Sequence, residues 1–475
     1  MADDGASVER LRQYLRELKP AARSFLIGEL ERKLLRGEEA SGVSPVLGAS
    51  MVLRELRQVV REQREGAPRV VDAVRLFFKP IELFIVDDGT ERKHPGRIAR
   101  SALEPLWTWV RRDLLPDEAK AFVDGVNEAL RAGNQAKATQ LVRAFQDQVV
   151  RAIGEAIAAA ADDEKARRRM AMQIGTPRAA DDAGILLHVL KARDALATFA
   201  AHLPPHIPNL SDFKLDQAKV LIESTAAFDR EAFLHALLIV MSRLDSPWQL
   251  VRLGVRAAGT DAAARVAETP YGIAVTIIFA ELERLVGELR TELRSGRGLA
   301  TGALLKTIHD AVRGLRTELS MPVDSTWGRS LASLRGLISD LLKAEIEAAP
   351  DRVRRLLRVR PAAEIRPHSV VDPDEAMETE ALVDFVGICR NFAGELALNE
   401  VTQRTYSELQ HVLDSATQAL PDSLRQVDRA ERPFRQSQVD AARRLCAKVF
   451  SAEHAVPPGK LAESAAASER KLMRA

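Results

Sequence analysis

The stretch IFAELERLVGELRTEL, Ile278 to Leu293, decides the fold class. Its large apolar residues recur in steps of three and four, and this spacing places them on one face of an α-helix. The same spacing returns in the run from Leu305 to Leu319. The intervening SGRG, Ser295 to Gly298, is short enough to predict an antiparallel helix hairpin. Both runs end in the same five residues, LRTEL. The repeat has two explanations, chance and internal duplication, and no third copy is present to establish a repeat length.

The composition extends this helical prediction to the whole chain. With 46% hydrophobic and 29% charged residues, the 475-residue chain can bury a large core, which excludes disorder of the whole chain. Aromatic residues make up only 5%, whereas alanine, leucine, glutamate and arginine, which favour helices, predominate. The sequence therefore predicts an all-α fold, a multi-helical array of antiparallel helix hairpins and bundles without a substantial sheet.

Proline residues mark where several helices are expected to begin, because proline fits the first turn of a helix. These residues are Pro20, Pro68, Pro95, Pro177, Pro247 and Pro270. Breaks in the helical pattern near 162–175 and 360–375 divide the chain into domains. We predict an N-terminal helical domain (1–175), a central helical domain (176–360), a linker (361–373), a C-terminal helical domain (374–455) and a mobile tail (456–475).

The overall charge and the cysteines narrow the class of protein. The chain has 69 basic and 67 acidic residues, so no global field draws it to nucleic acid, and an anionic partner would need a local patch. Cys389 and Cys446 are far apart and have no neighbours at metal-ligand spacing, so we expect no disulfide framework, metal or cofactor.

The hydropathy of the chain predicts its location. The N-terminus lacks the apolar core of a signal peptide. The longest apolar run, Gly272 to Ala280, is about half the ~20 residues that a membrane span requires. We expect a soluble, cytoplasmic protein without an integral membrane segment.

An unusual corner lies at FFKPIELFIVDDGTERKHPGRI, Phe77 to Ile98. A helix is predicted to stop before Pro80, because proline disfavours helical geometry in the residue before it. The apolar IELFIV that follows predicts a short extended plug near residues 80–88, without a strand partner. Its core residues are expected to be Ile81, Leu83, Phe84 and Ile85. The next helix is predicted to begin at Pro95.

The same corner carries a candidate site for an anionic ligand. Its residues are Asp87, Asp88, Arg92, Lys93, His94, Arg97 and Arg100. Cations at the N-terminus of a helix, where unpaired N–H groups also point outward, suit a phosphate or a carboxylate. Alternatively, the two aspartates neutralise the cations and fix the corner without any ligand.

A second candidate surface is a run of arginines that precedes the predicted linker. It contains Arg352, Arg354, Arg355, Arg358 and Arg360, whereas the residues from Asp372 to Asp384 include six acids and no base. One interpretation is a latch, in which the acidic segment masks the arginines until an anionic partner displaces it. The other is a pair of solvated helix ends whose charges suit the helix macrodipole.

No motif assigns a reaction to this chain. The sequence contains no GxSxG, P-loop or HExxH motif, and no GxGxxG follows a strand. We therefore expect a non-enzymatic scaffold or adaptor that binds protein partners through helix faces, and no catalytic residue is assigned. One alternative is a helical enzyme or anionic small-molecule binder at the Asp87 to Arg100 corner. The other is peripheral association with anionic membranes through the Arg352 to Arg360 face. The sequence leaves open whether the chain forms a homo-oligomer.

Overall fold

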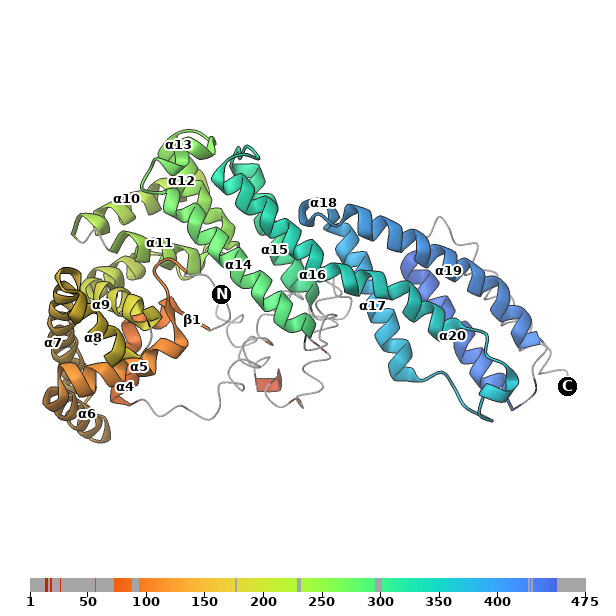
Figure 1. Ribbon diagram of the computed structural model, residues 1–475, viewed down its shortest axis with the longest axis horizontal. Helices are drawn as coiled ribbons and strands as arrows, with labels where there is room; N and C mark the ends of the chain where they lie inside the picture. The colour runs from red at the N-terminus through yellow and green to blue at the C-terminus, as the bar shows by residue number, and fades with distance from the viewer. Residues whose placement is uncertain are drawn as a thin grey trace. The chain divides into compact units, whose positions relative to one another are not determined.

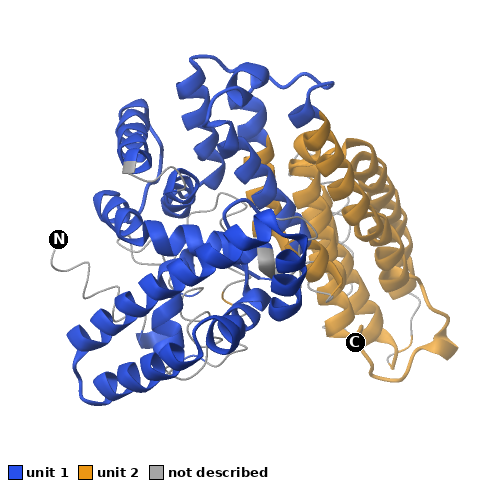
Figure 2. Ribbon diagram, turned by 60° about the vertical axis from the view of Figure 1, so that its left-hand side comes forward, with its two compact units in different colours: residues 1–23, 51–287, 313–328 blue, residues 24–50, 288–312, 329–475 orange. Residues whose placement is uncertain are grey.

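The computed structural model describes residues 72–87, 94–175, 177–228, 232–294, 301–425, 428 and 430–450, with a few isolated residues nearer the N-terminus. Over these residues the chain consists of helices, loops and one two-stranded parallel sheet (Figure 1). The predicted all-α fold is therefore confirmed. Two compact units are distinguished in Figure 2: unit 1 comprises residues 1–23, 51–287 and 313–328, and unit 2 comprises 24–50, 288–312 and 329–475. The three-domain division stays a prediction, and the tail at 456–475 lies outside the described residues.

Unit 1 is built around the long helix α9 (Pro177–His202). The first elements of this unit are α4 (Ala73–Phe78), the 3₁₀ helix η1 (Lys79–Phe84), β1 (Ile85–Val86), β2 (Ile98–Ala99), the 3₁₀ helix η2 (Arg100–Ala102), α5 (Leu103–Trp109) and the π-helical turn η3 (Val110–Leu114). The next are α6 (Pro116–Arg131), α7 (Gln135–Asp162), α8 (Glu164–Ile174), α10 (Asp212–Phe228), α11 (Ala232–Arg243), the 3₁₀ helix η4 (Pro247–Leu250), α12 (Val251–Ala258) and α13 (Ala263–Ala267). Helix α9 packs against α7, α8, α10, α11 and η1.

Unit 2 is a helical bundle. Its elements are η6 (Ala362–Glu364, a 3₁₀ turn), α17 (Pro373–Asn391), α18 (Ala393–Leu396), α19 (Asn399–Arg425) and α20 (Arg432–Val449). Helix α19 packs along α20, and α17 contacts both. Three helices contribute residues to both units: α14 (Gly272–Arg294), α15 (Gly302–Glu318) and α16 (Thr326–Leu357). The Ser295 to Gly298 turn between α14 and α15 lies outside the described residues, so their antiparallel pairing stays a prediction.

A cluster of aromatic rings holds the first helices of unit 1 together. Phe77 is fully buried, and its ring lies 4.9–6.4 Å, between centroids, from four other rings. These belong to Phe78, Trp107, Phe122 and Phe145. The buried amide of Gln146 donates a hydrogen bond of 2.8 Å to the carbonyl oxygen of Phe77. Helices α4, α5, α6 and α7 therefore share one core.

The structure corrects the predicted conformation of the plug. Lys79–Phe84 is a 3₁₀ helix rather than an extended segment, because Pro80 fits its first turn. Residues three apart share a face of a 3₁₀ helix, so Ile81 and Phe84 are both buried as expected. Leu83 points away and is 47% exposed, contrary to the prediction. The strand Ile85–Val86 does have a partner, since it pairs in parallel with Ile98–Ala99.

The helix predicted to begin at Pro95 is also absent. Pro95 and Gly96 form a turn that leads into β2, and the next α-helix begins only at Leu103. Gly96 has a φ of +68°, and a Cβ atom there would lie 2.9 Å from the side chain of Leu234. A helix that began at Pro95 would place Gly96 in the helical conformation, with a negative φ. The turn could not then approach α11 in this way. By contrast, the helix starts predicted at Pro177 and Pro247 are confirmed by α9 and η4.

The predicted linker, 361–373, separates α16 from α17 but is tied to α20. The backbone N–H of Val371 donates to Ser437 Oγ at 2.9 Å. Val371 and Ile365 are both buried. This segment is therefore part of the surface of unit 2, and it brings exposed apolar residues next to α20.

Replacing Gly314 with alanine should destabilise unit 1 by about 1–3 kcal/mol, the usual cost of overpacking. A Cβ atom at Gly314 in α15 would overlap the indole ring of Trp248. Gly154 in α7 has open space at its Cβ position, so Gly154→Ala should instead stabilise the unit by about 0.5–1 kcal/mol. Thermal unfolding followed by tryptophan fluorescence measures both changes. A Gly314→Ala protein as stable as the Gly154→Ala protein would contradict the close approach.

Candidate functional sites

The described residues of the Phe77 to Ile98 corner do not converge on one anion. Arg100 Nε pairs with Asp87 Oδ1 at 2.5 Å, with both side chains largely exposed. Arg97 instead faces Glu281, with 3.8 Å between its Nη2 and the carboxylate, and both side chains are 17% exposed. Three candidate residues, Asp88, Arg92 and Lys93, lie outside the described residues. An anion site at this corner stays a prediction.

A buried charge network surrounds Arg97. Burial lowers the pKa of Arg97, and the charge of Glu281 opposes this change. Burial alone would raise the pKa of Glu281, but hydrogen bonds from Arg284 and the charges of Arg284, Arg97 and His94 outweigh it and lower that pKa. His94 is itself buried. The charge of Glu281 is therefore stabilised within the protein, whereas Glu281 compensates the burial of the Arg97 charge only in part. Through these charges the corner is joined to α14.

The arginine run is largely neutralised within unit 2. Its pairs are Arg352 with Glu378 (3.3 Å), Arg354 with Asp351 and with Glu408 (2.9 Å to Glu408), and Arg358 with Glu364 (2.5 Å). Arg360 lies over the ring of Phe434, 5.2 Å from its centroid. In the described part of the chain only Arg355 of this run has no such partner. Arg352 and Glu378 join the basic run to the acidic run, and association of this face with anionic membranes stays a prediction.

The cysteines do not supply a nucleophile near neutral pH. Cys389 and Cys446 are both buried. Burial raises the pKa of the Cys389 thiol well above its usual value. Burial, with the nearby Asp414 carboxylate, raises the pKa of Cys446 to about 12. Both thiols are therefore protonated and act as small apolar core residues.

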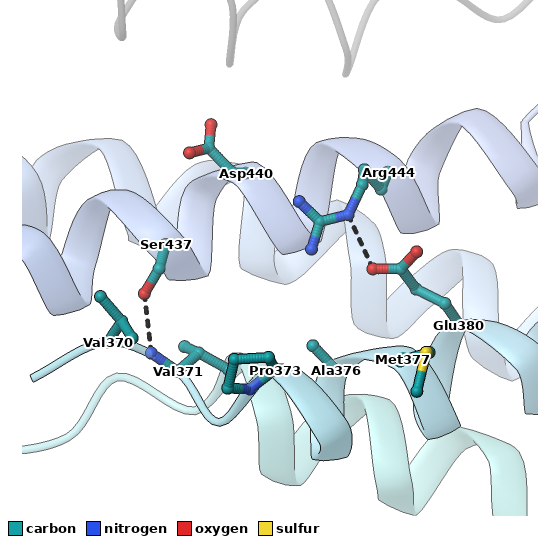
Figure 3. Close-up of a pocket in the computed structure, with 9 residues that line it drawn as sticks. All are labelled: Val370, Val371, Pro373, Ala376, Met377, Glu380, Ser437, Asp440 and Arg444. Atoms are coloured by element: carbon teal, nitrogen blue, oxygen red, sulfur yellow. Dashed lines mark hydrogen bonds and ion pairs between the residues drawn. The ribbon is translucent and has the colours of Figure 1, made fainter. Parts of the chain in front are cut away.

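A surface groove in unit 2 was not foreseen from the sequence. It has a volume of about 420 Å³ and lies where the predicted linker meets α17 and α20 (Figure 3). Its apolar side chains are Val370, Val371, Pro373, Ala376 and Met377, and its polar side chains are Glu380, Ser437, Asp440 and Arg444. Val370 is 53% exposed and Met377 is 63% exposed. Two exposed apolar side chains thus line the hollow, at opposite ends of the row of residues drawn in Figure 3.

The groove follows from how α17 begins. Asp372 caps this helix by accepting a hydrogen bond of 3.0 Å from the backbone N–H of Asp374, and Pro373 occupies the first turn. The bond from Val371 to Ser437 holds the preceding residues against α20. On the other side, Arg444 of α20 pairs with Glu380 at 2.7 Å (Figure 3).

Two acids, Glu380 and Asp440, line the groove, and further acids of α17 lie near it in sequence. Glu380 is neutralised by Arg444, and Asp384 pairs with Lys448 at 2.6 Å. Asp374, Glu375 and Asp440 form no ion pair with the described residues, and Asp440 only accepts a long hydrogen bond, 3.5 Å, from Gln436. Exposed carboxylates beside exposed apolar side chains suit a ligand that is both apolar and basic.

Comparison with protein-family models, with curated proteins and with solved structures finds no match to this chain. Within the described residues, no group of three or more histidine, cysteine, aspartate or glutamate side chains could hold a metal ion. None of the helices described here is long and apolar enough to span a bilayer.

Proposed function

We propose that this chain is a non-enzymatic scaffold or adaptor that binds a protein partner through the groove of unit 2. The occupant of this groove is a short amphipathic helix of the partner, with lysine or arginine beside its apolar face. The observation that carries the proposal is the position of Met377 and Val370, exposed in the lining of a hollow that also includes the carboxylate of Asp440, which has no ion pair with the described residues.

The apolar part of the groove provides the affinity. Exposed apolar side chains next to a concave surface are typical of helix-in-groove recognition, in which anchors of the partner fill the hollow. Methionine is flexible and polarisable, so Met377 can adapt to anchors of different shape. A hollow of about 420 Å³ accepts one or two anchor side chains. We expect affinity in about the micromolar range, as for small interfaces.

The carboxylates provide selectivity for a basic partner. Asp440 lines the groove from α20, and Asp374 and Glu375 lie in the first turn of α17, between the lining residues Pro373 and Ala376. A basic side chain beside the apolar anchors gains attraction from these acids, whereas an acidic one is repelled. Because the carboxylates are accessible to solvent, this selectivity should weaken as the salt concentration rises.

A designed peptide tests this proposal without knowledge of the partner. The basic amphipathic helix LKKLLKLLKKLLKL, labelled with a fluorophore, should bind the full chain more tightly than LEELLELLEELLEL in fluorescence anisotropy. Met377→Glu places a charge among the apolar contacts and should weaken binding by about tenfold or more, the effect of losing about 1.4 kcal/mol or more. Leu337→Glu, at an exposed apolar position of α16 outside the groove, is the matched control.

Two results would contradict the proposal. One is equal binding of the basic peptide to the wild-type and Met377→Glu proteins. The other is equal weakening by Met377→Glu and Leu337→Glu, because general adhesion to exposed apolar residues would then explain the binding.

A further inference from the structure

Unit 1 contains a pocket that is larger than the groove, and η1 of the corner forms part of its lining. Its volume is about 730 Å³, and it lies among η1, α7, α9 and α11. This volume is within the range of sites that bind drug-sized molecules. The large apolar side chains that line it are Leu76, Leu83, Phe84, Val142, Leu196 and Ile239.

The shape of this pocket follows from the 3₁₀ helix. Helix η1 packs against both α9 and α11, so Leu83 and Phe84 form one wall. Ala197 and Ala200 on α9 have short side chains that leave the hollow unfilled. Leu83 points outward, contrary to the prediction that it is a core residue of the plug. Its side chain therefore lines this pocket.

Positive charge is in excess around the pocket. Four cationic residues line it, Lys79, Arg143, Arg193 and Arg243, against the single acid Asp194. Arg143 forms an ion pair with Asp194, with 2.9 Å between its Nη2 and the carboxylate. Arg193 pairs at 2.7 Å with Asp147, which is not part of the lining.

The remaining donors have no strong partner. Lys79 and Arg243 form no ion pair with the described residues, and Arg243 makes only a long hydrogen bond, 3.4 Å, to the carbonyl oxygen of Pro205. Arg193 Nε is buried and has no hydrogen-bond acceptor. A buried N–H group without an acceptor is costly.

We propose that this pocket binds a small amphipathic anion, an alkyl chain or ring system that bears one carboxylate or phosphate group. The apolar body contacts Leu83, Phe84 and Ile239, and the head group is held by Lys79 and Arg243. This pairing of an apolar wall with few convergent polar groups is typical of small-molecule sites. Charge-assisted hydrogen bonds from lysine and arginine are the strongest that a protein offers such a head group.

Binding of three dodecyl probes to the full chain, measured by isothermal titration calorimetry below the critical micelle concentrations of the two anions and below the solubility limit of dodecanol, tests this proposal. Dodecanoate or dodecyl phosphate should bind, and the tighter of the two identifies the head group. Dodecanol, which has the same chain without the charge, should bind more weakly. Dodecanol binding equal to that of both anions would overturn the assignment, as would the absence of binding by both anions.

Three variants locate the binding. Lys79→Gln combined with Arg243→Gln should weaken the preferred anion by about ten- to a hundredfold and leave dodecanol nearly unchanged. Arg151→Gln combined with Lys191→Gln makes the same charge change on the exposed surfaces of α7 and α9, outside the pocket, and should have little effect. Ala200→Phe should abolish binding of all three probes by filling the hollow.

If Ala200→Phe does not fold, the comparison of the two double glutamine variants still tests the proposal, because both variants leave the apolar wall intact. Equal weakening by both pairs would overturn the proposal, since general attraction to positive charge would then explain the binding. Met377→Glu should leave binding of the anion unchanged, so failure of this site and failure of the groove are distinguishable.

Discussion

Replacing Phe77 with alanine should lower the free energy of unfolding of unit 1 by about 4 kcal/mol, within the range for removing a buried phenylalanine. Phe77 has no exposed surface and contacts four other aromatic rings that come from α4, α5, α6 and α7. Its removal leaves a cavity at the junction of these four helices, and the edge-to-face ring contacts are lost with it.

Tryptophan fluorescence during urea unfolding measures this loss in unit 1 alone. All four tryptophans of the chain, Trp107, Trp109, Trp248 and Trp327, belong to that unit. Phe213→Ala is the matched control, because Phe213 is 78% exposed on α10 and its removal should cost little. Similar losses in both variants would show that the aromatic cluster does not form the core described here.

Replacing Gln438 with alanine should destabilise unit 2 by about 2–4 kcal/mol, because one buried and one partly buried carbonyl group lose their donor. Gln438 is fully buried in α20, and its Nε2 donates to the carbonyl oxygens of Leu356 (3.1 Å) and Arg358 (2.9 Å). The last carbonyls of a helix have no partner within that helix. Gln438 in α20 supplies a hydrogen-bond donor to the carbonyl groups at the end of α16. Arg435 likewise donates a hydrogen bond to the carbonyl oxygen of Arg360.

Amide hydrogen exchange measures this effect, since unit 2 has no tryptophan to report on it. Exchange at the end of α16 and along α20 should accelerate in the Gln438→Ala protein and stay unchanged in α9 of unit 1. Gln418→Ala, at an exposed position of α19, is the control. Unchanged exchange at Leu356 to Arg360 in the Gln438→Ala protein would contradict this role.

The helices were predictable from the sequence, whereas the corner was not. Steps of three and four between apolar residues depend only on the local period, so the all-α class followed from runs such as Ile278 to Leu293. The conformation of Lys79–Phe84 depends on tertiary contacts. IELFIV has the composition of a strand, but the packing of Ile81 and Phe84 against α9 and α11 favours a 3₁₀ helix.

The two pockets could not be predicted because their residues are distant in sequence. Lys79 and Arg243 reach one pocket from η1 and from the end of α11, and no local pattern connects them. Met377 is a large apolar residue of a predicted helix, and its exposure follows from the packing of α17. The arginine run was visible in the sequence, but the partner of Arg354 on α19 was not. Surface charge is therefore a poor guide to a site until its partners are known.

The claim that the groove of unit 2 holds a basic amphipathic helix is tested most directly by crosslinking in the source cell. A photoreactive amino acid is introduced at position 377, or at position 337 as the control, and the crosslinked segment is mapped by mass spectrometry. We expect a crosslink from position 377 to one protein, at a helical segment with an apolar face and adjacent lysine or arginine. No crosslink above that at position 337, or a crosslinked segment without basic residues, would contradict it.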